Sequence, residues 1–134
     1  MKTLFFTSLI ALLIFLPMIE GAFYKNIRAV EAEKLMKDHE GKGDLVILDV
    51  RKPGEFADGH IKGAINIDFW NKGFVDSVSK LDKKGLYLVY CTSGVRSGGA
   101  MKKMKSLGFE KIYNMKSGMF GWRAAKLPVT HRDK

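Results

Sequence analysis

Hydrophobic residues along this chain fall into short uninterrupted runs that alternate with segments of helical spacing. The two clearest runs, Leu45–Leu48 and Leu86–Tyr90, contain no charged residue. This is the pattern of parallel strands that are covered on both faces of a sheet. Three further segments complete the set of expected strands. They are Phe23–Ile27, a strand within Gly59–Ile67, and Lys111–Asn114.

The segments between the expected strands have the spacing of amphipathic helices. Apolar residues recur three or four positions apart in Ala29–Glu40, in Phe74–Leu81 and in a helix from about Ser97 to Gly108. Pro53–Ala57 is expected to form a short helical turn. The alternation of strands and helices predicts an α/β domain with a five-stranded parallel sheet and helices on both faces. In such folds ligands bind beyond the carboxyl ends of the strands.

The only cysteine, Cys91, lies where the run Leu86–Tyr90 ends and the next helix begins. A tight strand-to-helix loop presents backbone N–H groups inward, and the helix start adds partial positive charge, so the loop favours an anion. A thiol at the rim of this loop should have a lowered pKa and act as a nucleophile. A buried, unreactive cysteine is the alternative, but the hydroxyls, glycine and arginine that follow favour reactivity. The loop residues are Thr92, Ser93, Gly94, Val95, Arg96 and Ser97.

The segment Cys91–Ser97 resembles the active-site loop of single-domain rhodaneses, which are sulfurtransferases that carry a persulfide on the cysteine. The resemblance continues in the family's order through Leu48–Arg51, Gly59–Asn66, Gly118–Trp122 and Leu127–Val129. It implies a rhodanese-like fold and sulfur transfer through a Cys91 persulfide. It also implies that the reaction needs no cofactor and no metal.

Four other residues are candidates for supporting the site. Asp49 ends an expected strand and can pair with Arg51 in a turn, so we expect a structural role, and the resemblance implies that this pair orders the surroundings of the site. His60 is interpreted as a structural histidine, because transfer from a preformed thiolate needs no base. Trp122 is expected to pack under the site, where the Gly118 loop should also gather.

The expected chemistry is a double displacement. The Cys91 thiolate takes the outer sulfur of a small anionic donor such as thiosulfate, and a thiol or cyanide then removes it. Arg96 either fixes the loop or holds the oxygens of the donor in a bidentate manner. The neutral side chains Thr92 and Val95 stand where many relatives carry a basic residue, so the loop should hold thiosulfate more weakly.

Two other functions fit parts of this pattern. A phosphatase or arsenate reductase on the same fold also places an arginine after a cysteine loop, but four residues separate Cys91 from Arg96, and that class has one more. The shorter loop suits a single sulfur atom, and no general acid for a leaving alcohol is evident. The second alternative is a non-catalytic rhodanese-like module that carries or binds sulfur for another protein.

The N-terminal segment predicts where the protein is located, and its net charge predicts which partners it can bind. Residues 1–22 are expected to be a signal peptide of an exported, periplasmic protein, or an uncleaved anchor that would be the only link to a membrane, and residues 23–134 are the rhodanese-like domain. The net charge of +9 fits a solvated basic surface that attracts small anions, and we expect no nucleic acid partner. A chain with one cysteine cannot form an intramolecular disulfide. We also expect the protein to be a monomer.

Overall fold

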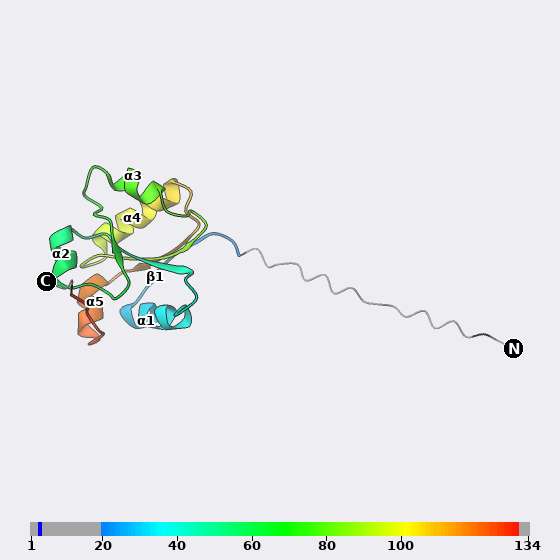
Figure 1. The fold of residues 1–134 in the computed structure, drawn as a ribbon, viewed down its shortest axis with the longest axis horizontal. Helices are drawn as coiled ribbons and strands as arrows, with labels where there is room; N and C mark the ends of the chain where they lie inside the picture. Colours follow the sequence, from blue (N-terminus) through cyan, green and yellow to red (C-terminus); the bar gives the residue numbers. More distant parts are fainter. Residues whose placement is uncertain (1–2, 4–19, 132–134) are drawn as a thin grey trace.

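The apolar strand Leu86–Tyr90 (β4) lies in the middle of a parallel five-stranded sheet. In this computed structural model, which describes residue 3 and residues 20–131 (Figure 1), the strand order is β1-β5-β4-β2-β3. The central position explains the uninterrupted apolar sequence of β4, because both of its faces are buried. The other strands are β1 Phe23–Ile27, β2 Leu45–Asp49, β3 Ile65–Asn66 and β5 Lys111–Met115.

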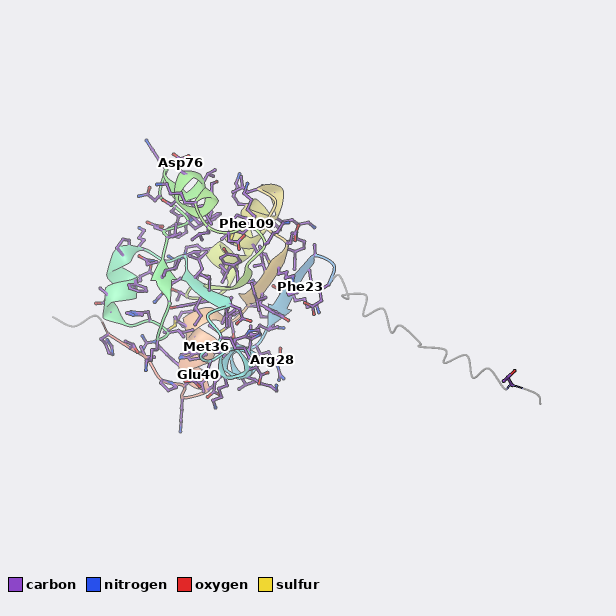
Figure 2. All side chains as sticks on the ribbon, turned by 45° about the vertical axis from the view of Figure 1, so that its right-hand side comes forward. Phe23, Arg28, Met36, Glu40, Asp76 and Phe109 are labelled. Atoms are coloured by element: carbon purple, nitrogen blue, oxygen red, sulfur yellow. The ribbon has the colours of Figure 1, made fainter. Side chains whose placement is uncertain are left out.

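Helices cover both faces of the sheet, so the predicted α/β class is confirmed (Figure 1). Side chains alternate between the faces along a strand, and those of β4 divide between two core clusters. Tyr87 and Val89 belong to the cluster on the α3 and α4 side, together with Phe109, which is labelled in Figure 2. Leu88 and Tyr90 face α1 and α5. The helices are α1 Ala29–Asp38, α2 Pro53–Asp58, α3 Phe74–Ser79, α4 Val95–Ser106 and α5 Gly118–Ala124.

Two elements differ from the sequence expectation. Helix α4 begins at Val95 rather than near Ser97, which leaves a shorter loop after Cys91. The segment expected to be a Gly118 loop is the helix α5. Gly118 and Gly121 lower the helix propensity of this segment, and the tertiary contacts of α5 override that preference.

The expected signal peptide falls almost wholly on residues 1–2 and 4–19, which lie outside the described residues, so it stays a prediction. Within the described part of the chain, every helix is too short or too polar to cross a membrane.

Candidate active site

Cys91 lies at the carboxyl end of the central strand β4, and the turn that follows it can be made only by glycine. Gly94 has a φ of +96°, a backbone conformation that side chains other than glycine disfavour. A Cβ atom at this position would also collide with the backbone carbonyl of Lys116. Gly94 therefore lets the loop turn sharply into α4 while it packs against the end of β5.

The first turn of α5 anchors the other side of the Cys91 loop. The backbone N–H of Met119 donates to the carbonyl of Cys91 at 2.8 Å, and that of Phe120 donates to the carbonyl of Thr92 at 3.1 Å. A Cβ atom at Gly118 would collide with the Cys91 carbonyl. Because α5 holds the carbonyl groups, the N–H groups of the loop remain free to turn toward the sulfur.

The sulfur of Cys91 lies at the floor of the loop, not at its rim as the sequence suggested. The residue is only 1% exposed and packs with the core cluster beneath α4. The backbone N–H of Gly94 donates to Sγ at 3.0 Å, and the Ser97 hydroxyl oxygen lies 3.3 Å from Sγ. The loop thus surrounds the sulfur with hydrogen-bond donors inside an otherwise apolar setting.

These contacts determine whether the pKa of Cys91 is raised or lowered from its ordinary value. Burial acts to raise the pKa, but hydrogen bonds from the Ser97 hydroxyl and from the backbone of Ser97, Gly94 and Ser93 outweigh it. The pKa of the Cys91 thiol is therefore below its ordinary value. The sequence pointed to the backbone donors of the loop. The hydroxyl of Ser97, one of the loop residues that the sequence named, is a further donor, and Ser97 is fully buried.

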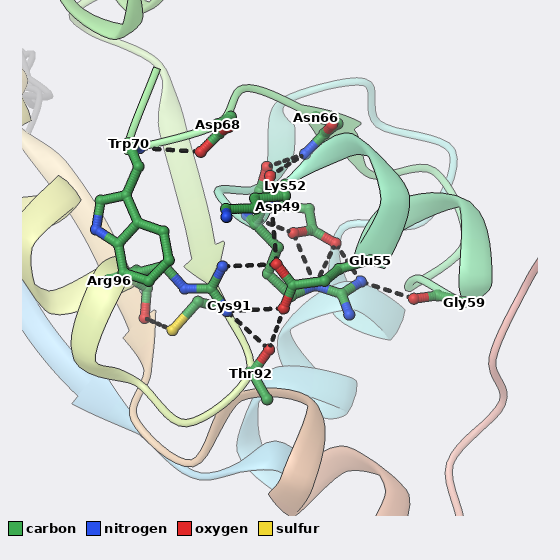
Figure 3. A network of polar contacts seen from close by, with 12 residues as sticks. Asp49, Lys52, Glu55, Gly59, Asn66, Asp68, Trp70, Cys91, Thr92 and Arg96 are labelled. Atoms are coloured by element: carbon green, nitrogen blue, oxygen red, sulfur yellow. Dashed lines mark hydrogen bonds and ion pairs between the residues drawn. The ribbon is translucent and has the colours of Figure 1, made fainter. Parts of the chain in front are cut away.

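Arg96 is bound to Glu55, a residue that the sequence analysis missed (Figure 3). Its Nη1 donates to Glu55 Oε2 at 2.7 Å, and its Nη2 donates to Oε1 at 2.9 Å. Nη2 also donates to the hydroxyl of Thr92 at 3.0 Å, and this hydroxyl donates to Glu55 Oε1 at 3.0 Å. The guanidinium lies 4.7 Å from the centroid of the Trp70 ring. This geometry favours the first of the two expected roles of Arg96, which is fixing the loop.

The ion pair also explains the charge state of Glu55. Hydrogen bonds from Arg96 lower the pKa of Glu55 to about 2, with further contributions from the backbone of Lys52 and from Thr92. The same bonds raise the pKa of Arg96. Both groups are therefore charged at neutral pH. A signal for Glu55 was present in the sequence, because a glutamate three residues after Lys52 suits a helix N-terminus, but its contact with the loop is long-range.

Asp49 and Arg51 form a buried ion pair at the end of β2, the strand next to β4. Arg51 Nη2 donates to Asp49 Oδ2 at 2.7 Å and to the carbonyl of Gly59 at 2.6 Å. The backbone N–H of Arg51 donates to Asp49 Oδ1 at 2.9 Å. Burial acts to lower the pKa of Arg51, but Asp49 outweighs it and the pKa is raised. The pair fixes the turn that leads into α2, the helix that carries Glu55.

The structure places His60 and Trp122 in the framework around the site. The ring of His60 stacks on Phe56 with centroids 3.7 Å apart, and its Nδ1 lies 2.8 Å from the Phe56 carbonyl oxygen. Trp122 donates from Nε1 to the carbonyl of Pro128 at 2.8 Å. It belongs to the core cluster between the sheet and α5, on the opposite face from Cys91.

Val95 and Ser93 complete the loop. Val95 is the first residue of α4 and is 79% exposed. Ser93 contributes its backbone to the sulfur. Among residues 20–131 the structure contains no group of three or more His, Cys, Asp or Glu side chains that could hold a metal ion. The site brings together a thiol whose pKa is lowered by the donors around it and, beside it, the ion pair between Arg96 and Glu55.

Comparison with known proteins identifies the fold family. The model of the Rhodanese-like domain matches residues 31–125. Thiosulfate sulfurtransferase GlpE of Coxiella burnetii is 32% identical over 101 residues, which cover 75% of this chain and 89% of that protein. YqhL of Bacillus subtilis is 34% identical over 119 residues, which cover 87% and 93%. A rhodanese-related protein from Thermoplasma volcanium matches with a TM-score of 0.67 at 27% identity, covering 80% of this chain and 98% of that one. The chain therefore belongs to the rhodanese-like domain family.

Proposed function

We propose that this protein is a sulfurtransferase that carries sulfane sulfur as a persulfide on Cys91. In the first step the Cys91 thiolate attacks the outer sulfur of a donor such as thiosulfate. A new S–S bond forms, the S–S bond of the donor breaks, and sulfite leaves with the electron pair of that bond. No net electron transfer to an external oxidant or reductant is needed.

In the second step an acceptor thiolate or cyanide attacks the outer sulfur of the persulfide. The bond between the two sulfur atoms on the enzyme breaks, and its electron pair restores the Cys91 thiolate. The acceptor leaves as a persulfide or as thiocyanate. The protein begins and ends this cycle in the same state, so it needs only a negative sulfur and room for one more sulfur atom.

The observation that carries the proposal is the lowered pKa of Cys91 inside the ring of donors from Gly94 and Ser97. Preorganised N–H groups aimed at an anion stabilise it without reorganisation. They would stabilise the persulfide anion for the same reason. The likeness to thiosulfate sulfurtransferase GlpE supports thiosulfate as one donor.

The geometry also argues against the phosphatase alternative. A phosphatase needs a general acid for the leaving alcohol. The carboxyl group that contacts the loop, Glu55, has a pKa of about 2 and is held by Arg96, so it is ionised at neutral pH and has no proton to give. Hydrolysis of an aryl phosphate without persulfide formation would contradict the proposal.

Mass spectrometry tests the proposal directly. The purified domain is incubated with thiosulfate, and its intact mass is compared with that of the Cys91→Ser variant. We expect a gain of one sulfur atom on the wild-type protein and none on the variant. Release of that sulfur to cyanide, read as thiocyanate, shows turnover. A persulfide that forms but passes neither to cyanide nor to a small thiol would favour the carrier alternative.

The setting of the reaction is a separate proposal. We propose that the protein acts after export, in the periplasm, as a monomer with small anionic donors and without a nucleic acid partner. The apolar, uncharged sequence from Thr3 to Ile19 supports export. Cell fractionation with an antibody against the domain tests this, and a full-length protein in the soluble cytoplasmic fraction would contradict it.

A further inference from the structure

Glu55 brings a negative charge to a loop whose task is to receive an anionic donor. It lies on α2, and its carboxylate contacts both Thr92, the residue after Cys91, and Arg96 (Figure 3). The side chain of Glu55 is 36% exposed, so it faces solvent as well as the loop. An anionic sulfur donor that approaches the loop from solvent is therefore repelled by this carboxylate.

Arg96 balances the charge of Glu55, so the pair offers no net positive charge to a donor. Both of its terminal nitrogens donate to Glu55, and Nη2 also donates to Thr92. Trp70 lies over the guanidinium at 4.7 Å, and the side chain of Arg96 is only 11% exposed. Three of the five N–H groups of Arg96 are thus used by Glu55 and Thr92, which leaves two at most for the oxygens of a donor. The charge of the ion pair is close to zero, and the Cys91 thiolate adds one negative charge.

The remaining side chains of the loop add no positive charge. Thr92, Ser93 and Val95 are neutral. The ammonium of Lys52 lies 5.5 Å from the centroid of the Trp70 ring and is exposed, so solvent screens it. A dianion that approaches a negatively charged sulfur beside a carboxylate is repelled about twice as strongly as a monoanion, because the Coulomb energy is proportional to the charge of the donor.

We propose that Glu55 sets the donor selectivity of this site and favours sulfane-sulfur donors with one negative charge, such as thiosulfonates and organic persulfides, over the thiosulfate dianion. This inference rests on the proposed sulfurtransferase function. With a thiosulfonate, the Cys91 thiolate bonds to the outer sulfur, the S–S bond of the donor breaks, and a sulfinate leaves with its electron pair. The total charge of enzyme and donor is the same before and after this step.

Thiosulfate and methanethiosulfonate form a matched pair of probes, because both pass one outer sulfur and differ in charge. The experiment measures kcat and KM for both donors with the wild-type protein and with Glu55→Gln, using cyanide as the acceptor. We expect the substitution to lower the KM for thiosulfate about tenfold and that for methanethiosulfonate about threefold. A role in fixing the loop alone would instead lower kcat for both donors equally and leave the ratio of their KM values unchanged.

The chain offers a matched control in Glu31. Glu31 also accepts the backbone N–H of the residue that precedes its helix, and it also pairs with an arginine, but it lies on α1. Glu31→Gln removes the same charge and the same type of contact, and we expect both KM values to stay at their wild-type levels. Glu55→Asp keeps the charge, so it should keep the wild-type ratio of the KM values.

The outcomes separate this inference from the proposed function. If neither donor adds sulfur to Cys91 of the wild-type protein, the proposed function is wrong. If both donors do so and Glu55→Gln leaves the ratio of KM values unchanged, the proposal for Glu55 is wrong and the sulfurtransferase function stands. Glu55→Ala provides a second neutral variant if Glu55→Gln does not fold, and the same change in the ratio is expected.

Discussion

Two carboxylate–guanidinium pairs lie near the carboxyl ends of the central strands, and they differ in their surroundings. Asp49 and Arg51 are two residues apart, and their side chains are 0% and 6% exposed. Glu55 and Arg96 are 41 residues apart, and the carboxylate is 36% exposed. Removing one partner of a buried pair leaves an uncompensated charge in the core, whereas an exposed carboxylate can return to water. The Asp49–Arg51 pair therefore stabilises the fold. A substitution in the Glu55–Arg96 pair can change function while it lowers the free energy of unfolding only a little.

The largest effect is expected for the buried pair. Asp49→Asn leaves the charge of Arg51 uncompensated in the core, and we expect the free energy of unfolding to fall by about 3–5 kcal/mol. Urea denaturation followed by circular dichroism measures this. A loss below about 1 kcal/mol would mean that water reaches Arg51 and that the two pairs do not differ in the way described.

The next effect concerns the sulfur itself. Ser97→Ala removes the hydroxyl 3.3 Å from Sγ, which is one of the contacts that lower the pKa of Cys91. A rise of one pKa unit reduces the thiolate fraction about tenfold at a pH below the pKa. We expect persulfide formation near neutral pH to slow by up to about tenfold, with the rate recovering at higher pH. A pH profile that coincides with that of the wild type would show that the hydroxyl does not act on the thiolate.

A smaller effect is expected from adding charge at the rim. Val95 is 79% exposed and makes none of the contacts between Glu55 and Arg96, so Val95→Arg should add a free cation without disturbing them. We expect the KM for thiosulfate to fall about threefold. The effect is small because solvent and salt screen the attraction between an exposed arginine and the anionic donor. Thr92→Arg is a less clean test, because it removes the hydroxyl that bonds to Glu55. If neither variant lowers the KM, charge at the loop does not control donor binding.

The smallest effect is the contribution of Glu55 to stability. Its pKa is about 2 in the folded protein and 4.5 is the reference value, so the folded state favours the ionised form. The resulting stability is present above pH 4.5 and is lost as the pH falls toward 2. Since the group is partly exposed, we expect less than about 1 kcal/mol. The difference in unfolding free energy between wild type and Glu55→Gln should vanish between pH 4.5 and 2, and a difference that persists there would contradict this.

Local sequence was enough to predict the framework of the site. Uninterrupted apolar runs indicated β2 and β4, and the order of residues after Cys91 indicated a donor-lined loop at the carboxyl end of β4. The contact between Glu55 and Arg96 could not be predicted this way, because it joins residues 41 positions apart. Helix α5 was missed since Gly118 and Gly121 disfavour a helix locally, and the depth of Cys91 depends on how α4 packs.

The proposed chemistry requires that the loop stabilise the thiolate of Cys91. The ultraviolet absorbance of the thiolate, titrated against pH and corrected with Cys91→Ser, measures this without a reagent that must reach the buried sulfur. We expect a midpoint below the value of about 8.5 for a free cysteine. A midpoint at or above that value would show that burial outweighs the hydrogen bonds from Gly94 and Ser97, and it would contradict the proposed chemistry.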